Sequence, residues 1–368
     1  MNSGKLFFAG DVVLKTQPLL SAQICEIIEQ SDIVSCNFEA PIMAYGKAVE
    51  KAGPHLAQLQ EAPAIVEKLG FNLINLANNH IHDYGDEALI ATIKSFKNSQ
   101  TVGAGDMHEA YSLKTFLIND TVIGFLSFCE NGFGALTGIQ KDAKGYAWIN
   151  HPQVNEIIKT SKNNTDILII QAHAGVEQVN VPLPEWRQRY KELIDCGADA
   201  IIAHHPHVPQ GWELYNEKPI FYSLGNFYFD YDNRHPLWNT GLIVTIDFEN
   251  KKIKNWNIHV VKKVGNNIDI IDNQETTMYL QHLNNLLLDP QYTEEINKAA
   301  LILWDNAYKY YYENAFNGIS NYSPYRLLKH IKRMLFMKKT NYTMLWHNLF
   351  IESNKWMIDR AISLKTKI

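Results

Sequence analysis

Cysteine is scarce in this chain of 368 residues, which contains only Cys25, Cys36, Cys129 and Cys196. These residues are widely spaced and none forms a CxxC pair, so neither a thiolate zinc site nor a disulfide framework is expected. Three of them lie in apolar runs or amphipathic helices, where a free thiol packs as a small hydrophobe. A reducing compartment is therefore the expectation.

Long apolar runs and a strong charge of either sign are also lacking. No stretch reaches about 18 consecutive apolar residues, which excludes an ordinary membrane span. The strand-like run from Leu6 to Ala9 comes almost at once, and no signal-peptide pattern precedes it. The formal net charge of −5 gives no indication of nucleic-acid binding. The sequence thus predicts a cytoplasmic, globular protein without nucleic acid as a partner.

Short apolar runs alternate with helical patterns over the first 230 residues or so, which predicts an α/β layer structure. The expected helices are 19–30, 62–69, 86–98 and 185–196. The expected strands are 5–9, 33–38, 73–77, 122–128, 167–172, 200–203 and 220–224. Two further runs, 241–248 and 256–261, read as a hairpin, and from about Thr276 four helical segments are expected. We therefore expect one domain over 1–272 and a helical C-terminal extension over 273–368.

Most of the expected strands end in a polar cluster. Loops at the carboxyl ends of strands converge on one crevice in open α/β sheets, so residues far apart in sequence can share a site there. The clusters are Gly10-Asp11, Asn37 with Glu39, Asn78-Asn79-His80, His173, and His204 to His207.

The first two clusters are weak signals when each is taken alone. Gly10-Asp11 is also an ordinary turn, although its carboxylate could bind a metal while the glycine lets the backbone turn. Asn37 and Glu39 point to the same side of a strand by alternation, but a solvated strand end also explains the pair in isolation.

The histidine clusters are more specific. An Asn beside a His after a strand, as in Asn79-His80, is typical of dinuclear phosphoesterases, where the Asn binds metal and the His donates a proton. Histidines two apart, as in His205-Pro206-His207, can bind two adjacent metals. Taken alone, His173 would be interpreted as a structural residue. The second histidine cluster, at a similar strand end, favours a role for His173 in the site. Asn226, in the run 223–227, fits a structural turn and a site role equally well.

The order of these motifs resembles the CapA, or poly-gamma-glutamate capsule-synthesis, family, from about Leu6 to Phe229. The motifs that carry the resemblance are Gly-Asp, Asn-Phe-Glu, Asn-Asn-His-x-x-Asp-Tyr-Gly, Gly-Ala-Gly, His-Ala-Gly-Val-Glu, His-His-Pro-His-Val-Pro-Gln and Tyr-Ser-Leu-Gly-Asn-Phe. Members look like calcineurin-type phosphoesterases, which implies an α/β/β/α sandwich around a centre of one or two divalent ions of zinc, manganese or iron.

The resemblance also implies roles for individual residues. Asp11 and His207 look like ligands of a first metal, and Glu39 like the bridging carboxylate, although Asn37 could take that place. Asn79, His173 and His205 look like ligands of a second metal, and His80 like the proton donor. The residues expected to contact substrate are Asn37, Asn78, Glu177, His204 and Asn226.

Two positions depart from the pattern. Phosphoesterases of this type usually have a His two residues after the first Asp, where this chain has Val13, so the first metal would lack one ligand. Position 174 is Ala, where the family more often has an aromatic residue.

The function that the resemblance implies is metal-dependent hydrolysis of the phosphoester type in the synthesis of a capsule or surface polymer. The substrate would be a phosphorylated sugar, a lipid-linked intermediate or an anionic polymer, and other capsule-synthesis proteins could be partners. The alternative is a non-catalytic accessory protein that binds a polymer or a partner. The basic, amphipathic segment 326–339 could contact the inner membrane face, although a helix packed on its own domain explains it better.

Overall fold

The computed structural model describes residues 2–43, 45–139, 142–315, 323–335 and 341–366. The chain divides into two compact units. The first comprises Met1–Val49 and His55–Leu288, and the second comprises Glu50–Pro54 and Asp289–Ile368. Helix α7 (Gln274–Asn285) belongs to the first unit, beyond the boundary expected at 272/273. It is fixed there because Asn284 Oδ1 accepts a hydrogen bond of 2.9 Å from the Trp212 backbone N–H.

The larger sheet of the first unit has the order β2-β18-β17-β16-β1-β3-β4-β5, and β15 also pairs with β1. The sheet is mixed around β1, because β3 and β15 run parallel to β1 and β16 runs antiparallel to it. Their bounds are β1 Ser3–Val13, β2 Leu19–Leu20, β3 Ile33–Phe38, β4 Leu73–Asn75, β5 Gln100–Val102, β15 Asn226–Phe229, β16 Thr240–Glu249, β17 Lys252–Val264 and β18 Asn267–Ile271.

The second sheet has the order β13-β14-β12-β11-β8-β7, and β8, β11, β12 and β14 run parallel to one another. Its strands are β7 Lys114–Ile118, β8 Thr121–Cys129, β11 Ile167–His173, β12 Ala200–His204, β13 Trp212–Tyr215 and β14 Lys218–Phe221. A small third sheet pairs β6 (Ala104–Gly105), β10 (Gly145–Ala147) and β9 (Ala135–Leu136).

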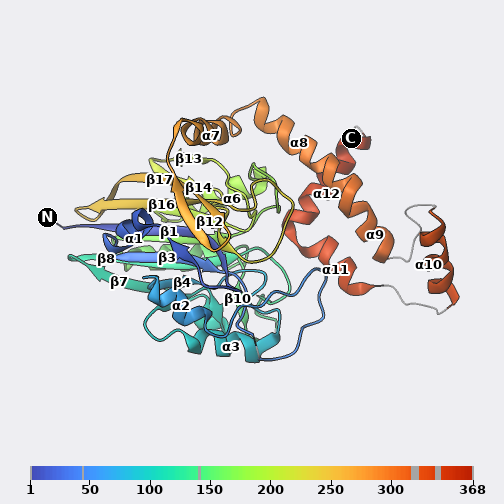
Figure 1. Ribbon diagram of the computed structural model, residues 1–368, viewed down its shortest axis with the longest axis horizontal. Helices are drawn as coiled ribbons and strands as arrows, with labels where there is room; N and C mark the ends of the chain where they lie inside the picture. Colours follow the sequence, from blue (N-terminus) through green and yellow to red (C-terminus); the bar gives the residue numbers. More distant parts are fainter. Residues whose placement is uncertain (1, 44, 140–141, 316–322, 336–340, 367–368) are drawn as a thin grey trace. The chain divides into compact units, whose positions relative to one another are not determined.

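The two large sheets pack face to face. Leu6 and Phe8 of the first sheet share a buried apolar cluster with Phe125, Ile169 and Ile202 of the second. On the other face of the first sheet, helices α1 (Ala22–Glu29), α2 (Ala62–Lys68) and α3 (Gly85–Ser95) cover a separate cluster. Helices α5 (Val154–Asn163) and α6 (Pro184–Asp195) contact the second sheet. The expected α/β/β/α sandwich is confirmed (Figure 1).

One expected helix was wrong in its first residues. The segment from Leu19 starts as strand β2, which pairs in parallel with β18, and α1 begins only at Ala22. The backbone N–H groups of Leu19 and Ser21 donate to the carbonyl oxygens of Asn266 and Ile268, and these bonds hold the segment extended. The apolar pattern alone did not reveal this pairing because the partner strand lies about 250 residues away.

The second unit is helical, as expected for a C-terminal extension. Helix α10 begins at Pro324, directly after Ser323. Leu328 and Ile331 on α10 are exposed, but residues 336–339 of the segment predicted to contact a membrane lie outside the described residues. No helix among the described residues is long and apolar enough to cross a membrane. The helices of this unit are α8 Gln291–Leu303, the π-helix η1 Trp304–Tyr308, α9 Lys309–Ala315, α10 Pro324–Leu335, α11 Tyr342–Phe350 and α12 Glu352–Thr366.

Candidate metal centre

The carboxyl ends of strands from both sheets meet at one edge of the sandwich. In the first sheet β1 carries Asp11, β3 is followed by Glu39, and the turn after β4 carries Asn79. In the second sheet β11 ends in His173, and β12 is followed by His205 and His207. Parallel strands that end at one edge thus bring together side chains that are distant in sequence.

Gly10 is required where β1 approaches the turn before β15. A Cβ atom at this position would lie 1.9 Å from the Gly225 carbonyl oxygen. The backbone N–H of Asp11 donates to that same oxygen at 2.9 Å. The missing side chain therefore lets the two segments meet and places Asp11 at the centre.

Asp11, Glu39 and His207 form a buried triad. His207 Nδ1 lies 3.2 Å from Asp11 Oδ2, and His207 Nε2 lies 3.6 Å from Glu39 Oε1. The side chains of both acids are fully buried and His207 is 3% exposed. One ligand atom from each of the three residues could contact a single cation, since these atoms all lie within 4.8 Å of one another.

A second group adjoins the triad through Glu39. His173 Nε2 lies 2.9 Å from Asn79 Oδ1, 3.0 Å from His205 Nδ1 and 3.8 Å from Glu39 Oε1. The same carboxylate oxygen therefore faces both groups. Asn37 joins them from the side, because its Nδ2 donates to Asp11 Oδ1 at 2.7 Å.

These donor atoms fit a divalent cation. Two ligand atoms that are each about 2.1 Å from one ion lie roughly 3.0–3.4 Å apart at tetrahedral or octahedral angles. The separations around His173 and between His207 and Asp11 are close to this range. Among the described residues, none donates a hydrogen bond to the buried Glu39 Oε1. A buried carboxylate oxygen without a donor is expected where an ion supplies the missing partner.

The pKa values of the group reflect burial and mutual charge. Burial raises the pKa of Glu39 well above its ordinary value, His207 opposes this, and Asp11 adds to it. Burial disfavours protonation of His207, but the charges of Glu39 and Asp11 prevail and raise its pKa to about 10. Without an added cation, a protonated His207 thus supplies the positive charge beside the two acids.

The two histidines of the second group behave in the opposite way. Burial, with the neighbouring histidines, lowers the pKa of His173 well below its usual value. Burial also lowers the pKa of His205 to about 4, although Glu177 opposes the shift. Both rings are therefore neutral near pH 7, which is the form that binds metals.

The backbone is strained where it presents this pair of histidines. His205 has φ of 97° and His207 has φ of 57°, both in the region that glycine favours. Such conformations cost about 1–3 kcal/mol each and persist when the surrounding structure imposes them. Here they place two imidazoles that lie two residues apart against different parts of the centre.

His80 lies beside these groups and is held by an acid. Its Nδ1 is 2.7 Å from Asp83 Oδ2, and that oxygen also accepts the backbone N–H of Leu56 at 2.7 Å. His80 is 5% exposed and Asp83 is 1% exposed. Asp83 therefore fixes the orientation of the imidazole, and a proton passed to a substrate would leave from Nε2.

Most of the residues predicted to contact substrate lie in the interior. Asn78 Nδ2 donates to the Phe38 carbonyl oxygen, and Asn226 Oδ1 lies 3.0 Å from His207 Nδ1. His204 is fully buried, with Nδ1 at 3.5 Å from Asp11 Oδ1. With Asn37, these four surround the ligands, whereas Glu177 is exposed. Their predicted contact with substrate stays a prediction.

Val13, the position that departs from the expected phosphoesterase pattern, lies in an apolar cluster. Its side chain is fully buried beside Ala40, Leu56, Phe229 and Trp238. Phe229 and Trp238 also flank His207, with ring centroids at 4.8 Å and 4.9 Å. An aromatic wall therefore supports His207 on this side of the centre.

Sequence reasoning missed Glu130, a buried acid beside the centre. It follows β8, and its Oε1 lies 3.6 Å from His205 Nε2. The strand 122–128 was expected, so the rule that polar residues follow strand ends could have found it. The signal was present, because Asn131 follows Glu130 directly and makes a polar pair at this strand end.

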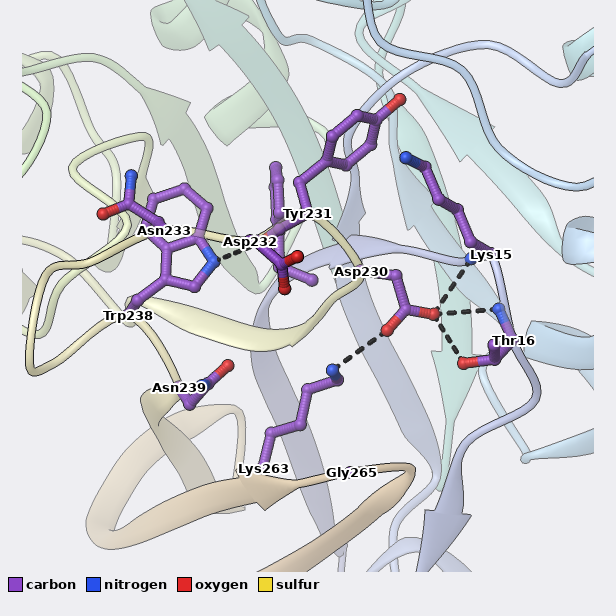
Figure 2. A pocket seen from close by; sticks show the side chains of 11 residues that line it. Lys15, Thr16, Asp230, Tyr231, Asp232, Asn233, Trp238, Asn239, Lys263 and Gly265 are labelled. Atoms are coloured by element: carbon purple, nitrogen blue, oxygen red, sulfur yellow. Dashed lines mark hydrogen bonds and ion pairs between the residues drawn. The ribbon is translucent and has the colours of Figure 1, made fainter.

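A pocket of about 380 Å³ lies behind the aromatic wall (Figure 2). Phe229 and Trp238 line it, together with Lys15, Tyr231 and Lys263. The Lys263 amino group pairs with Asp230 at 2.9 Å. The Lys15 amino group lies over the Tyr231 ring, 3.3 Å from its centroid, and has no carboxylate partner among the described residues.

Asp230 lines this pocket and accepts several hydrogen bonds from its neighbours. Its Oδ2 accepts the backbone N–H groups of Lys15 and Thr16 and the Thr16 hydroxyl, as Figure 2 shows. Burial opposes ionisation of Asp230, but the bonds from Thr16 and Lys263 lower its pKa. The carboxylate is thus satisfied by its own neighbours, whereas the Lys15 amino group contacts the Tyr231 ring.

Comparison with known proteins gives a consistent picture. Residues 5–231 match the family model described as bacterial capsule synthesis protein PGA_cap. Over 213 residues the chain is 36% identical to the capsule biosynthesis protein CapA of Bacillus anthracis and 35% identical to the PGA biosynthesis protein CapA of Bacillus subtilis. Each alignment covers 55% of this chain, and the chain spans about half the length of these relatives (52% and 55%). A 5′-nucleotidase structure from Candida albicans is 10% identical with a TM-score of 0.43, covering 79% of this chain and 56% of the other.

Proposed function

Because this chain belongs to the bacterial capsule synthesis protein family, we propose that it is a metal-dependent hydrolase of the phosphoester type that acts in capsule or surface-polymer synthesis. The observation that carries the proposal is the position of Glu39 Oε1. It faces His207 of one ligand group at 3.6 Å and His173 of the other at 3.8 Å. A carboxylate shared in this way is the arrangement expected of a two-ion hydrolytic centre.

The first group, Asp11 and His207, and the second group, Asn79, His173 and His205, would each hold one ion with Glu39 between them. Nitrogen, amide and carboxylate ligands suit zinc, manganese or iron. When bound, such ions lower the pKa of water and stabilise negative charge on a phosphoryl oxygen.

The residues of the chain supply the remaining functions. Asn37 holds Asp11, and the wall of Phe229 and Trp238 holds His207, so the ligands are placed before an ion arrives. His80, oriented by Asp83, would donate a proton to the leaving oxygen.

The pocket behind the aromatic wall supports a substrate with an anionic portion. Lys15 offers an amino group that no described carboxylate neutralises, and it lies close to the face of Tyr231. Phosphorylated sugars, lipid-linked intermediates and anionic polymers all carry oxygen anions of the kind that a lysine binds. The catalytic step would act on a phosphoester bond of such a molecule.

The test is a panel of phosphomonoesters and phosphodiesters, assayed with protein loaded with zinc, manganese or iron. The expected result is turnover by at least one metal form and its loss in His80→Gln with metal still bound. Stoichiometric metal without turnover of any member would favour the alternative, a non-catalytic protein that binds a polymer or a partner. A variant of Phe229 or Trp238 is not a suitable control, because these side chains pack against His207, a proposed metal ligand. Glu249→Gln, on the far hairpin, is suitable.

A further inference from the structure

Glu130 lies at the junction of two strands of the second sheet. It directly follows β8, which pairs in parallel with β11 so that Cys129 lies opposite His173. The Glu130 backbone N–H donates to the His173 carbonyl oxygen at 3.0 Å, and its side chain is buried. The acid is therefore fixed to the strand end that carries His173.

The Glu130 carboxylate faces the outer nitrogen of His205. Oε1 lies 3.6 Å from His205 Nε2 and accepts the backbone N–H of Gly175 at 3.3 Å. The first distance exceeds that of a hydrogen bond, but in a buried place it is an effective electrostatic contact. A negative charge at this position favours the hydrogen on Nε2.

The inner nitrogen of the same ring faces the centre. His205 Nδ1 lies 3.0 Å from His173 Nε2, and His173 Nε2 in turn lies 2.9 Å from Asn79 Oδ1. A hydrogen on His205 Nε2 leaves a lone pair on Nδ1, which is the form that an ion requires. Acids that hold the outer nitrogen of a metal-binding histidine in this way set its tautomer and ring orientation.

We infer that Glu130 is a positioning residue that holds His205 with Nδ1 directed at the second ligand group. The inference rests on the metal centre of the proposed function, but not on the reaction that the centre performs. The negative charge is the discriminating feature. If residue 130 were needed only to accept the Gly175 N–H, a neutral amide would serve equally well. A carboxylate also favours the His205 tautomer that carries its hydrogen on Nε2.

The experiment compares wild type with Glu130→Gln and Ser127→Ala. The glutamine keeps the shape and an acceptor for Gly175 but removes the charge. The control alters another buried side chain of β8, whose hydroxyl has no hydrogen-bond partner among the described residues. Zinc affinity is measured by competition with a chelating dye, and the visible spectrum of the cobalt-loaded protein reports the ligand arrangement. Thermal unfolding of the metal-free forms monitors the fold.

The expected result is a loss of about 10–100-fold in zinc affinity for Glu130→Gln, with a changed cobalt spectrum and an unchanged metal-free melting temperature. Ser127→Ala should keep the wild-type affinity. Equal zinc affinity for Glu130→Gln and wild type would overturn the positioning role. Wild type that binds no metal would overturn both this role and the metal centre. Wild type that binds metal but hydrolyses nothing would overturn only the proposed reaction.

Discussion

His207 Nδ1 lies 3.2 Å from Asp11 Oδ2. This contact connects the histidine cluster after β12 with the carboxylate on β1. Both side chains are buried, and Phe229 and Trp238 pack against the imidazole. Asp11 and His207 form the first ligand group, and Glu39 lies between this group and His173 of the second group.

Replacing Asp83 with Asn should weaken catalysis without removing metal. The carboxylate orients His80 through Nδ1 at 2.7 Å, and positioned acids and bases contribute about 10²–10⁴-fold to rates. We expect kcat to fall by at least tenfold for Asp83→Asn and further for His80→Gln, with metal content unchanged. Elemental analysis beside steady-state kinetics checks both. Loss of metal in His80→Gln would instead make His80 a ligand.

Lys15→Met should weaken binding of an anionic substrate more than it slows turnover. Lys15 lines the pocket behind the aromatic wall and is not one of the proposed metal ligands. A charged hydrogen bond of this type is worth enough to raise KM about tenfold. Lys252→Met, an exposed lysine that does not line the pocket, is the control. An unchanged KM for every anionic member of the panel would remove Lys15 from substrate binding.

Gly10→Ala should destabilise the protein. The added Cβ would meet the Gly225 carbonyl oxygen at 1.9 Å, and both are backbone positions that the sheet fixes. We expect a loss of about 3 kcal/mol in the free energy of unfolding, measured with urea. At Gly53, where φ is 90° and no atom lies within 4 Å of an added Cβ, alanine should cost about 1–2 kcal/mol. Equal costs at the two positions would contradict the close approach.

Glu213 should make stability depend on pH in the acid range. Burial opposes its ionisation, but Arg187 at 2.8 Å, with Tyr222 and Lys191, lowers its pKa from 4.5 to about 2. A lowered pKa in the folded state stabilises the protein above about pH 4.5, and this contribution disappears as the pH falls towards 2. Glu213→Gln should therefore melt below wild type at pH 7, and the gap should close near pH 2. The exposed Glu87→Gln should show no such trend.

Strand ends were the most informative part of the sequence. The runs 33–38 and 167–172 match β3 and β11 almost residue for residue, because buried strands are continuous apolar segments. The order of polar clusters then indicated which side chains converge. The α/β/β/α sandwich followed from the family resemblance and is confirmed by the two packed sheets.

Other features depend on contacts that no local pattern records. Strand β15 was missed because its pairing with β1 arises only once Gly10 meets Gly225. Glu130 was missed because its role depends on His205, which follows another strand, β12. The burial of Asn78 and Asn226 likewise depends on neighbours across the site, so it could not be predicted from the sequence alone.

Metal content of the purified protein tests the central claim most directly. It should be measured by elemental analysis, after incubation with zinc, manganese and iron, for wild type and for the double variant His205→Ala with His207→Ala. The account predicts near-stoichiometric metal in wild type and its loss in the double variant, with both folded by circular dichroism. A wild type that stays free of all three metals would contradict the account.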